Sequence, residues 1–235
     1  MEPEKEQEIA NLRALNLTPK QIAHKLGLRV SEVSAVIRAQ AEEHALAHGK
    51  TATLDPLFEC WANEGAVEHF FDNPTPSTAT VEDESQGMAI VTVTRKAGHN
   101  RFVICTYLLD YWCLGLKDTI GPRKFSTQDY AYFIDQAYQG FDEPPQKISL
   151  DQAQAMVYSV IDYAEGLGFK PHRDFQNSKA HLGEWNGQGK LDCGRDGKPC
   201  YFCGPYDDPH KILKTLTENV GEDNFDYVIE GESYR

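Results

Sequence analysis

The sequence lacks any apolar run long enough for a membrane helix, which needs about 20 consecutive apolar residues. The longest apolar stretch, residues 102–109, has the length of a strand and is interrupted by Thr106. The N-terminus is acidic and polar, the opposite of the basic and then apolar start of a secretory signal. We therefore expect no membrane partner and a cytoplasmic protein.

The sequence is also short of recognisable cross-linking and catalytic patterns. Its six cysteines show no spacing typical of a disulfide framework, and 235 residues can bury a core without covalent cross-links. This usage is typical of a reducing compartment. There is no internal repeat, no nucleophile elbow and no phosphate-binding loop. We therefore expect no cofactor.

Basic residues are scarce, with 23 Lys and Arg against 36 Asp and Glu, which gives a formal net charge of −13. Over residues 1–50 seven basic residues balance seven acidic ones, so the whole excess lies further along the chain. Phosphate neutralisation supplies most non-specific affinity for DNA, so the acidic remainder should bind nucleic acid poorly. Any DNA contact should then be local to the N-terminal module, and a homodimer would double it.

Residues 18–40 carry the pattern of two short helices joined by a sharp corner. Thr18 can cap the first helix and Pro19 suits its first position. Gly27 suits a helix end that needs positive φ, and Ser31 is placed to cap the second helix. The apolar positions expected to face inward are Ile22, Ala23, Leu26, Leu28, Val33, Val36 and Ile37.

The order of Ala23, Gly27, Val33 and Val36 resembles the helix-turn-helix of bacterial regulators, near the versions in sigma-factor region 4 and resolvase-type proteins. The resemblance covers residues 4–47. It implies a bacterial protein that binds DNA and regulates transcription, with its second helix in the major groove. The residues expected to contact DNA are Lys20, Arg29, Ser31, Ser34, Ala35 and Arg38.

A capped helix, a glycine corner and a second capped helix also describe any small helical hairpin. Within residues 18–40, four basic residues against one acidic residue favour contact with phosphates. The four glutamates of the first ten positions would instead be repelled by a phosphate backbone. Protein–protein contact is therefore the alternative use of the same fold.

Residues 54–235 have the mixed pattern of an α+β domain. Residues 88–95 and 101–111 have strand composition and flank a turn, which predicts an antiparallel hairpin with a buried second strand. Ser149 and Gln152 form a capping box before an apolar stripe over residues 153–167, which predicts the central helix. The overall expectation is an all-α helix-turn-helix domain over residues 1–50, followed by a mostly antiparallel sheet packed by helices.

Three further elements are expected in this domain. Ser126 is placed to open one helix and Asp208 to open another. Phe225, Tyr227 and Ile229 alternate with other residues, which predicts a final strand at the edge of a sheet.

Cys193, Cys200, Cys203 and His210 come closest to a metal-binding pattern, since zinc takes four such ligands. Residues 194–199 read as a turn, which would place Cys193 and Cys200 on paired strands. Residues three apart in an extended strand point to opposite faces, which disfavours joint ligation by Cys200 and Cys203. We therefore predict free structural cysteines and no metal.

Asp110, Cys113, His172 and Asp174 are the weak candidates for catalysis. Cys113 follows the buried strand and could act as a nucleophile with Asp110 or His172 as its partner. His172 and Asp174 follow the central helix and could bind a metal or act as base and orienter. The structural alternative is that Asp110 and Lys117 satisfy the backbone and each other at a strand–helix corner, while the helix dipole favours His172.

The leading expectation is a DNA-binding regulator with a C-terminal sensor or partner-binding domain. The alternatives are an enzyme, either a hydrolase or a nuclease, in the α+β body, or a protein–protein adaptor. A cleft that held Asp110, Cys113 and His172 together would favour the enzyme. Three segments are similar to sections of an uncharacterised family of bacterial proteins, a likeness that implies no activity: residues 107–118, 166–175 and 194–208.

Overall fold

The structure is a computed structural model, and the chain in it divides into two compact units, Met1–Thr53 and Leu54–Arg235. Each unit has its own apolar core. The structure describes Lys5, Ile9, residues 19–30, Glu32, Val33, Val36, and residues 54–72, 87–141, 144–229 and 232–234.

The N-terminal unit contains helix α2, Pro19–Leu26, whose inner side is apolar. Gly27 ends the helix at a φ of 66°, and the N–H of Leu28 donates to the C=O of Ala23 at 3.0 Å. This bond and the left-handed glycine are those of a Schellman cap, so the conformation predicted for Gly27 is observed. The buried residues of this unit are Ile9, Ile22, Ala23, Val33 and Val36.

The helical turn after this corner opens at Arg29, two residues before the predicted cap Ser31. The N–H of Val33 donates to the C=O of Arg29 at 3.2 Å, and the Glu32 carboxylate accepts the N–H of Arg29 at 2.8 Å. Arg29 therefore holds the cap position, with an acidic residue at the third helical position as in a capping box. The rest of the predicted DNA-contacting face lies outside the described residues and stays a prediction: Ser31, Ser34, Ala35 and Arg38.

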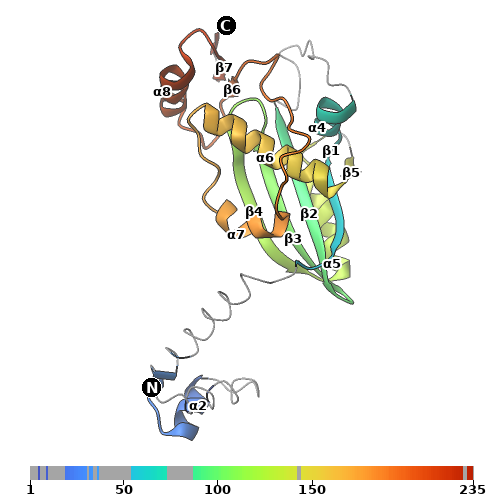
Figure 1. The fold of residues 1–235 in the computed structure, drawn as a ribbon, viewed down its shortest axis with the longest axis vertical. Coiled ribbons are helices and arrows are strands. Elements are labelled where there is room, and N and C mark those ends of the chain that lie inside the picture. Colours follow the sequence, from blue (N-terminus) through green and yellow to red (C-terminus); the bar gives the residue numbers. More distant parts are fainter. Residues whose placement is uncertain are drawn as a thin grey trace. The chain divides into compact units, whose positions relative to one another are not determined.

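The larger unit is built on a five-stranded sheet in the order β4-β3-β2-β1-β5, with every neighbouring pair antiparallel (Figure 1). The predicted hairpin is β2–β3, and β3 is the buried strand that the sequence indicated. The α+β class is thus confirmed for this unit. The strands are β1 Leu57–Asn63, β2 Met88–Gly98, β3 Arg101–Asp110, β4 Gly115–Phe125 and β5 Pro145–Ile148.

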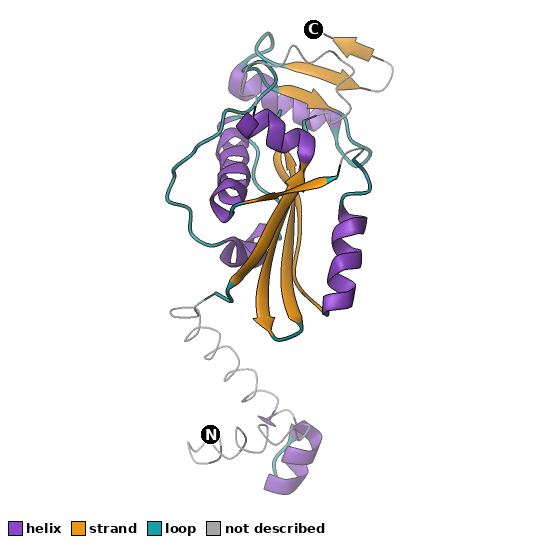
Figure 2. Cartoon of the chain, turned by 90° about the vertical axis from the view of Figure 1, so that its right-hand side faces the viewer, coloured by secondary structure: helices purple, strands orange, loops and turns teal. Residues whose placement is uncertain are grey.

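Helices cover both faces of this sheet, with α6 and α7 on one side and α5 on the other (Figure 2). In the described part of the chain, no helix combines the length and apolar character needed to cross a membrane. The helices are α4 Glu64–Val67, the π-helix η1 Glu68–Asp72, α5 Thr127–Ala137, α6 Leu150–Gly166, α7 Phe175–Leu182 and α8 Pro209–Val220.

Helix α6 is the central helix of the body, as predicted, and its capping box makes both reciprocal bonds. Val160 is fully buried and Ile161 is 7% exposed. Gly115, the first residue of β4, shows how closely the helix approaches, because a Cβ there would lie 2.5 Å from the Cβ of Ala164. Its φ of 73° also favours glycine, so the β3–β4 turn and α6 fit together only without a side chain at this position.

A smaller sheet contains β6 Cys200–Phe202, β7 Asp226–Ile229 and β8 Glu232–Tyr234, in the order β6-β7-β8. Strand β7 pairs parallel with β6 and antiparallel with β8, so it is central and the prediction of an edge strand is wrong. Helix α8, which Asp208 caps as predicted, forms the crossover between the parallel strands. It buries Leu216 in a cluster with Tyr201 and Phe225.

Candidate functional site

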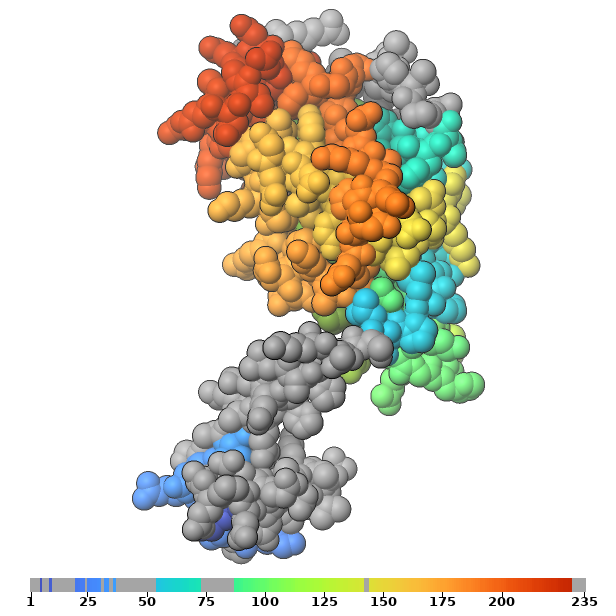
Figure 3. Space-filling model, in the orientation of Figure 1, coloured from blue at the N-terminus to red at the C-terminus, as the bar shows by residue number. Residues whose placement is uncertain are grey.

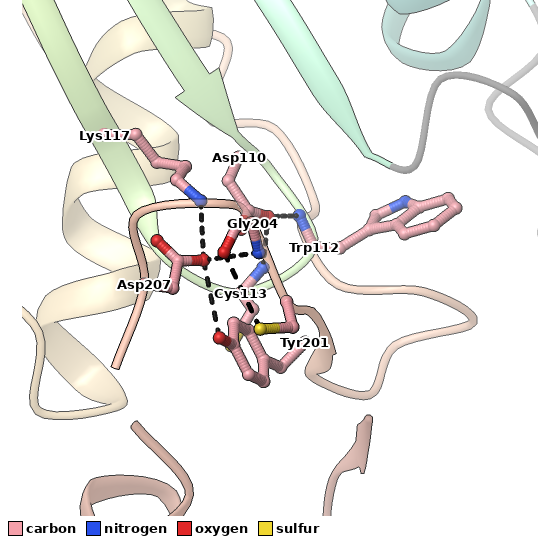
Figure 4. A network of polar contacts seen from close by, with 8 residues as sticks. Asp110, Trp112, Cys113, Lys117, Tyr201, Gly204 and Asp207 are labelled. Atoms are coloured by element: carbon pink, nitrogen blue, oxygen red, sulfur yellow. Dashed lines mark hydrogen bonds and ion pairs between the residues drawn. The ribbon is translucent and has the colours of Figure 1, made fainter. Parts of the chain in front are cut away.

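The turn between β3 and β4 holds a buried carboxyl group, that of Asp110, which is 4% exposed. Its Oδ1 accepts the backbone N–H groups of Trp112 at 3.1 Å and of Cys113 at 2.9 Å (Figure 4). Burial raises the pKa of Asp110 from 3.8 to about 6, although these bonds and the charge of Lys117 oppose the rise. The carboxyl group therefore stabilises a turn between two strands, where the sequence had suggested a strand–helix corner.

Lys117 pairs with Asp207, and not with Asp110 as the structural alternative supposed. The Lys117 Nζ lies 3.0 Å from the Asp207 Oδ2, and both side chains are largely buried. The same oxygen accepts the N–H of Gly204 at 2.9 Å and lies 3.4 Å from the hydroxyl of Tyr201 (Figure 4). Lys117 is the extra residue of a β-bulge in β4, a device that re-aims a side chain. The pair therefore ties β4 of the larger sheet to the loop between β6 and α8.

Cys113 is fully buried beside this carboxyl group. Burial raises the pKa of its thiol well above its ordinary value, and the charge of Asp110 raises it further. A reactive cysteine needs a thiolate in an electropositive, accessible setting, so this environment disfavours a nucleophile. The hydroxyl of Tyr163 on α6 lies in the same region, buried and without a hydrogen-bond partner among the described residues.

His172 lies against the end of β4, where its backbone N–H donates to the C=O of Leu116 at 3.0 Å. Its Nδ1 is 3.5 Å from the Asp118 Oδ1 and 3.9 Å from the Asp174 Oδ2. Both distances exceed those of a good hydrogen bond, and Nδ1 is buried with no hydrogen-bond partner in the part of the chain that the structure describes. Sequence reasoning missed Asp118 as a candidate because it did not predict β4. The segment that follows His172 and Asp174 is helix α7.

The described contacts do not assemble the catalytic candidates into one site. His172 and Asp174 approach each other, but in the described part of the chain His172 forms no hydrogen bond or ion pair with Asp110 or Cys113. The residues that would have to meet in an enzyme therefore belong to two separate places, a buried turn with Asp110 and Cys113 and a more exposed His172.

All six cysteines are free. Cys200 begins β6, Cys203 follows this strand, and Cys193 precedes the turn at residues 194–199 without belonging to a strand. His210 lies in the first turn of α8. Among the described residues, no group of three or more His, Cys, Asp and Glu side chains is placed to hold a metal ion. Burial raises the pKa of the Cys193 thiol to about 12, which is typical of a structural cysteine.

The N-terminal unit presents a third group of candidates. Lys20, Lys25 and Arg29 are exposed, while Ile22 and Ala23 of the same segment are buried. The cations therefore lie on the solvent side of an amphipathic unit, where a phosphate backbone can be reached.

No family model matches this chain, and neither a curated protein nor a solved structure does. The resemblance of residues 18–40 to helix-turn-helix proteins therefore stays a prediction.

Proposed function

We propose that this chain is a DNA-binding regulator, whose N-terminal unit contacts duplex DNA and whose α+β body binds a ligand or a protein partner. The observation that carries the proposal is the exposed set of Lys20, Lys25 and Arg29 on a unit with its own apolar core. Exposed cations on a short helical unit are what phosphate contact requires. A cytoplasmic, bacterial setting fits this role.

The polar groups of the body form contacts within the fold, and this supports a binding role over a catalytic one. Asp110 accepts hydrogen bonds from the backbone of a turn, Lys117 is paired with Asp207, and Cys113 is buried. Each of these groups is used by the fold itself, and catalytic groups need to reach a substrate. A sensor, a dimerisation domain or an adaptor needs only a surface.

The test is binding of the full chain to duplex DNA over a salt series, read by fluorescence anisotropy. Replacing Lys20 and Arg29 with alanine should lower the slope of log K against log salt by about 2, or roughly 1 per lost phosphate contact. The matched control replaces Lys170 and Lys211, two exposed lysines of the body, and changes the net charge equally. Equal binding by both double variants would contradict the proposal, as would a parent chain that binds no DNA.

A second candidate function rests on His172. Its Nδ1 lies 3.5 Å from the Asp118 Oδ1 and its side chain is 31% exposed, so a small shortening of this distance on substrate binding would let the carboxylate orient the ring as a general base. A hydrolase or nuclease in the body would use this pair. The nuclease would be favoured if the parent cleaves DNA, the His172→Gln variant does not, and the His210→Gln variant still does. If the parent leaves DNA intact, the nuclease hypothesis is wrong.

A further inference from the structure

One end of the five-stranded sheet is basic, although the body as a whole is acidic. Beyond residue 50 the chain has sixteen basic residues against twenty-nine acidic ones. Around the β2–β3 turn the balance reverses, and the two acidic residues of β3 and β4 lie at the opposite end of these strands. The exposed cations at the basic end are Lys96, Arg101, Arg123 and Lys124.

The strand register places these four cations at one end of the sheet, with Lys96 and Arg123 on the face of Phe102 and Ile104, and Arg101 and Lys124 on the face of Val103. Lys96 is the last residue of β2 in regular pairing with β3, and Arg101 is the first residue of β3. On the other side of β3, Arg123 pairs with Ile104 and Lys124 pairs with Val103. Neighbouring strands lie about 4.8 Å apart, so three strands span only about 10 Å. The β2–β3 turn extends past the helices in Figures 1 and 2, and Figure 3 shows the same segment in light green at the lower edge of the body.

The charges of these side chains are not neutralised within the described part of the chain. None of the four forms an ion pair with a described residue, and Arg123 instead lies over the ring of Phe125, 5.7 Å from its centre. The nearby carboxylate of Glu59 is already paired with Lys147 at 2.7 Å. Two further acidic residues lie near this end: Asp55, whose C=O accepts from Arg95, and Asp129 in the first turn of α5.

A fifth positive charge lies beneath this surface. Arg95 is buried, and its Nε and Nη1 donate to the C=O groups of His181 and Asp55 at 2.8 and 3.0 Å. Because carbonyl oxygens leave its charge in place, Arg95 adds to the positive potential at this end of the sheet.

The basic end is also the place where the chain enters the body. The N–H of Lys96 donates to the C=O of Pro56 at 2.8 Å, and Leu57 pairs with Arg95. Pro56 follows closely after Thr53, the last residue of the N-terminal unit. The basic end is therefore the part of the body that follows the N-terminal unit directly in sequence.

We propose that the basic end, defined by Lys96, Arg101, Arg123 and Lys124, contacts the phosphate backbone of the duplex DNA that the N-terminal unit binds. The inference rests on the DNA-binding function proposed above. Such a contact positions the protein and strengthens binding without reading bases. It also revises the expectation that any DNA contact is confined to the N-terminal module, because net charge conceals a local excess of the opposite sign.

The test uses the full chain and three variants, titrated with one duplex over about 50 to 200 mM salt. The first changes Lys96, Arg101, Arg123 and Lys124 to glutamine. Its matched control removes four exposed lysines elsewhere in the body: Lys170, Lys190, Lys211 and Lys214. The third carries Lys20→Gln and Arg29→Gln. Circular dichroism and thermal melting establish that each is folded, which is expected because all the changed side chains are exposed.

The basic-end variant should bind about tenfold more weakly at low salt, with a slope lower by about 2 to 4, while its control stays near the parent. Equal binding by the basic-end variant and its control would overturn the inference, and a weakened N-terminal variant would then leave the proposed function standing. If only the basic-end variant loses affinity, the surface is supported and the N-terminal assignment fails. A parent that binds anionic lipid vesicles but no DNA would overturn both.

Discussion

The two faces of the five-stranded sheet are built from different chemistry. The residues that face α6 are apolar, and Cys60 and Ala62 of β1, Ala89, Val91 and Val93 of β2, and Cys105 and Leu109 of β3 are among them. The alternate residues, which face α5, include Thr92, Thr94 and Thr106, with Thr92 paired to Thr106 across the strands. One sheet thus binds α6 by burial of apolar surface, and α5 through hydroxyl groups as well as through an apolar cluster of Phe102, Ile104 and Tyr130.

The hydroxyl groups on the α5 side make specific bonds. The Tyr138 hydroxyl donates to the C=O of Trp61 at 2.9 Å and lies 3.0 Å from the Thr92 hydroxyl. The Tyr130 hydroxyl is bonded to the Glu59 carboxylate at 2.5 Å. Burial raises the pKa of Glu59, but bonds from Lys147, Tyr130 and Trp61 outweigh it and hold that pKa below its ordinary value. The α5 face therefore depends on the directions and distances of specific hydrogen bonds, whereas the α6 face depends on the volume of the packed side chains.

The largest expected effect lies on the apolar face. Ile161→Ala should lower the free energy of unfolding of the body by about 2–5 kcal/mol, the range for a large deletion in a packed core. Urea denaturation of the full chain measures it, with Asp162→Ala on the exposed side of the same helix as a control expected to change little. A loss below about 1 kcal/mol would mean that this face is not tightly packed. A single transition that includes the N-terminal unit would contradict its separate core.

A smaller effect concerns Asp110, the carboxyl group buried in the region of Tyr163 of α6. Because its folded pKa is raised from 3.8 to about 6, its contribution to stability is complete below pH 4 and is lost as the pH rises through 6. The difference corresponds to about 3 kcal/mol, at 1.36 kcal/mol per pH unit.

Asp110→Asn keeps an oxygen that can accept the N–H groups of the turn and removes the titration. Its stability relative to the parent should therefore increase by up to about 3 kcal/mol between pH 4 and pH 7. Unfolding free energies at both pH values provide the measurement, with Asp162→Asn as the exposed control. A constant difference between variant and parent across this range would show that Asp110 titrates in the folded protein as it does in the unfolded chain.

The smallest effect tests the hydroxyl face directly. Tyr138→Phe keeps the ring and removes the bond to the C=O of Trp61, which leaves buried acceptors unpaired and should cost about 1–2 kcal/mol. Tyr132→Phe on α5 removes a hydroxyl from a residue that is 68% exposed and should change stability by less than about 0.5 kcal/mol. Equal stability of the two variants would mean that α5 is held by ring burial, and the contrast between the faces would disappear.

Local patterns made part of this fold predictable. The apolar stripe of α6 and the strands of the β2–β3 hairpin are long and periodic, and nearby residues mark their ends. Neighbouring positions in the sequence are therefore enough to predict them. Strand β4 was missed because it contains Pro122, Gly121 and several charges, which are typical of an edge strand yet resemble a loop. The threonines at positions 92, 94 and 106 alternate along their strands, and this signal could have revealed the hydroxyl face.

Long-range pairing made the rest unpredictable. The central place of β7 depends on β6 and β8, and nothing within its own four residues indicates two partners. Lys117 is paired with a carboxylate 90 residues away, and the β-bulge that directs it there has no local sequence signature. His172 was identified as a candidate from its own neighbourhood, whereas Asp118 reaches it from a distant strand.

The 90-residue separation between Lys117 and Asp207 has a consequence for the newly made chain. Ribosomes add about 5–20 residues per second, so the β3–β4 turn emerges roughly 5–20 seconds before its partner segment. During that interval α6 can already dock on the sheet, but Lys117 has no counter-ion and the N–H of Cys200 cannot yet reach the C=O of Trp112. The nascent protein therefore passes through a stage in which the large sheet is complete while the β3–β4 turn still lacks these contacts.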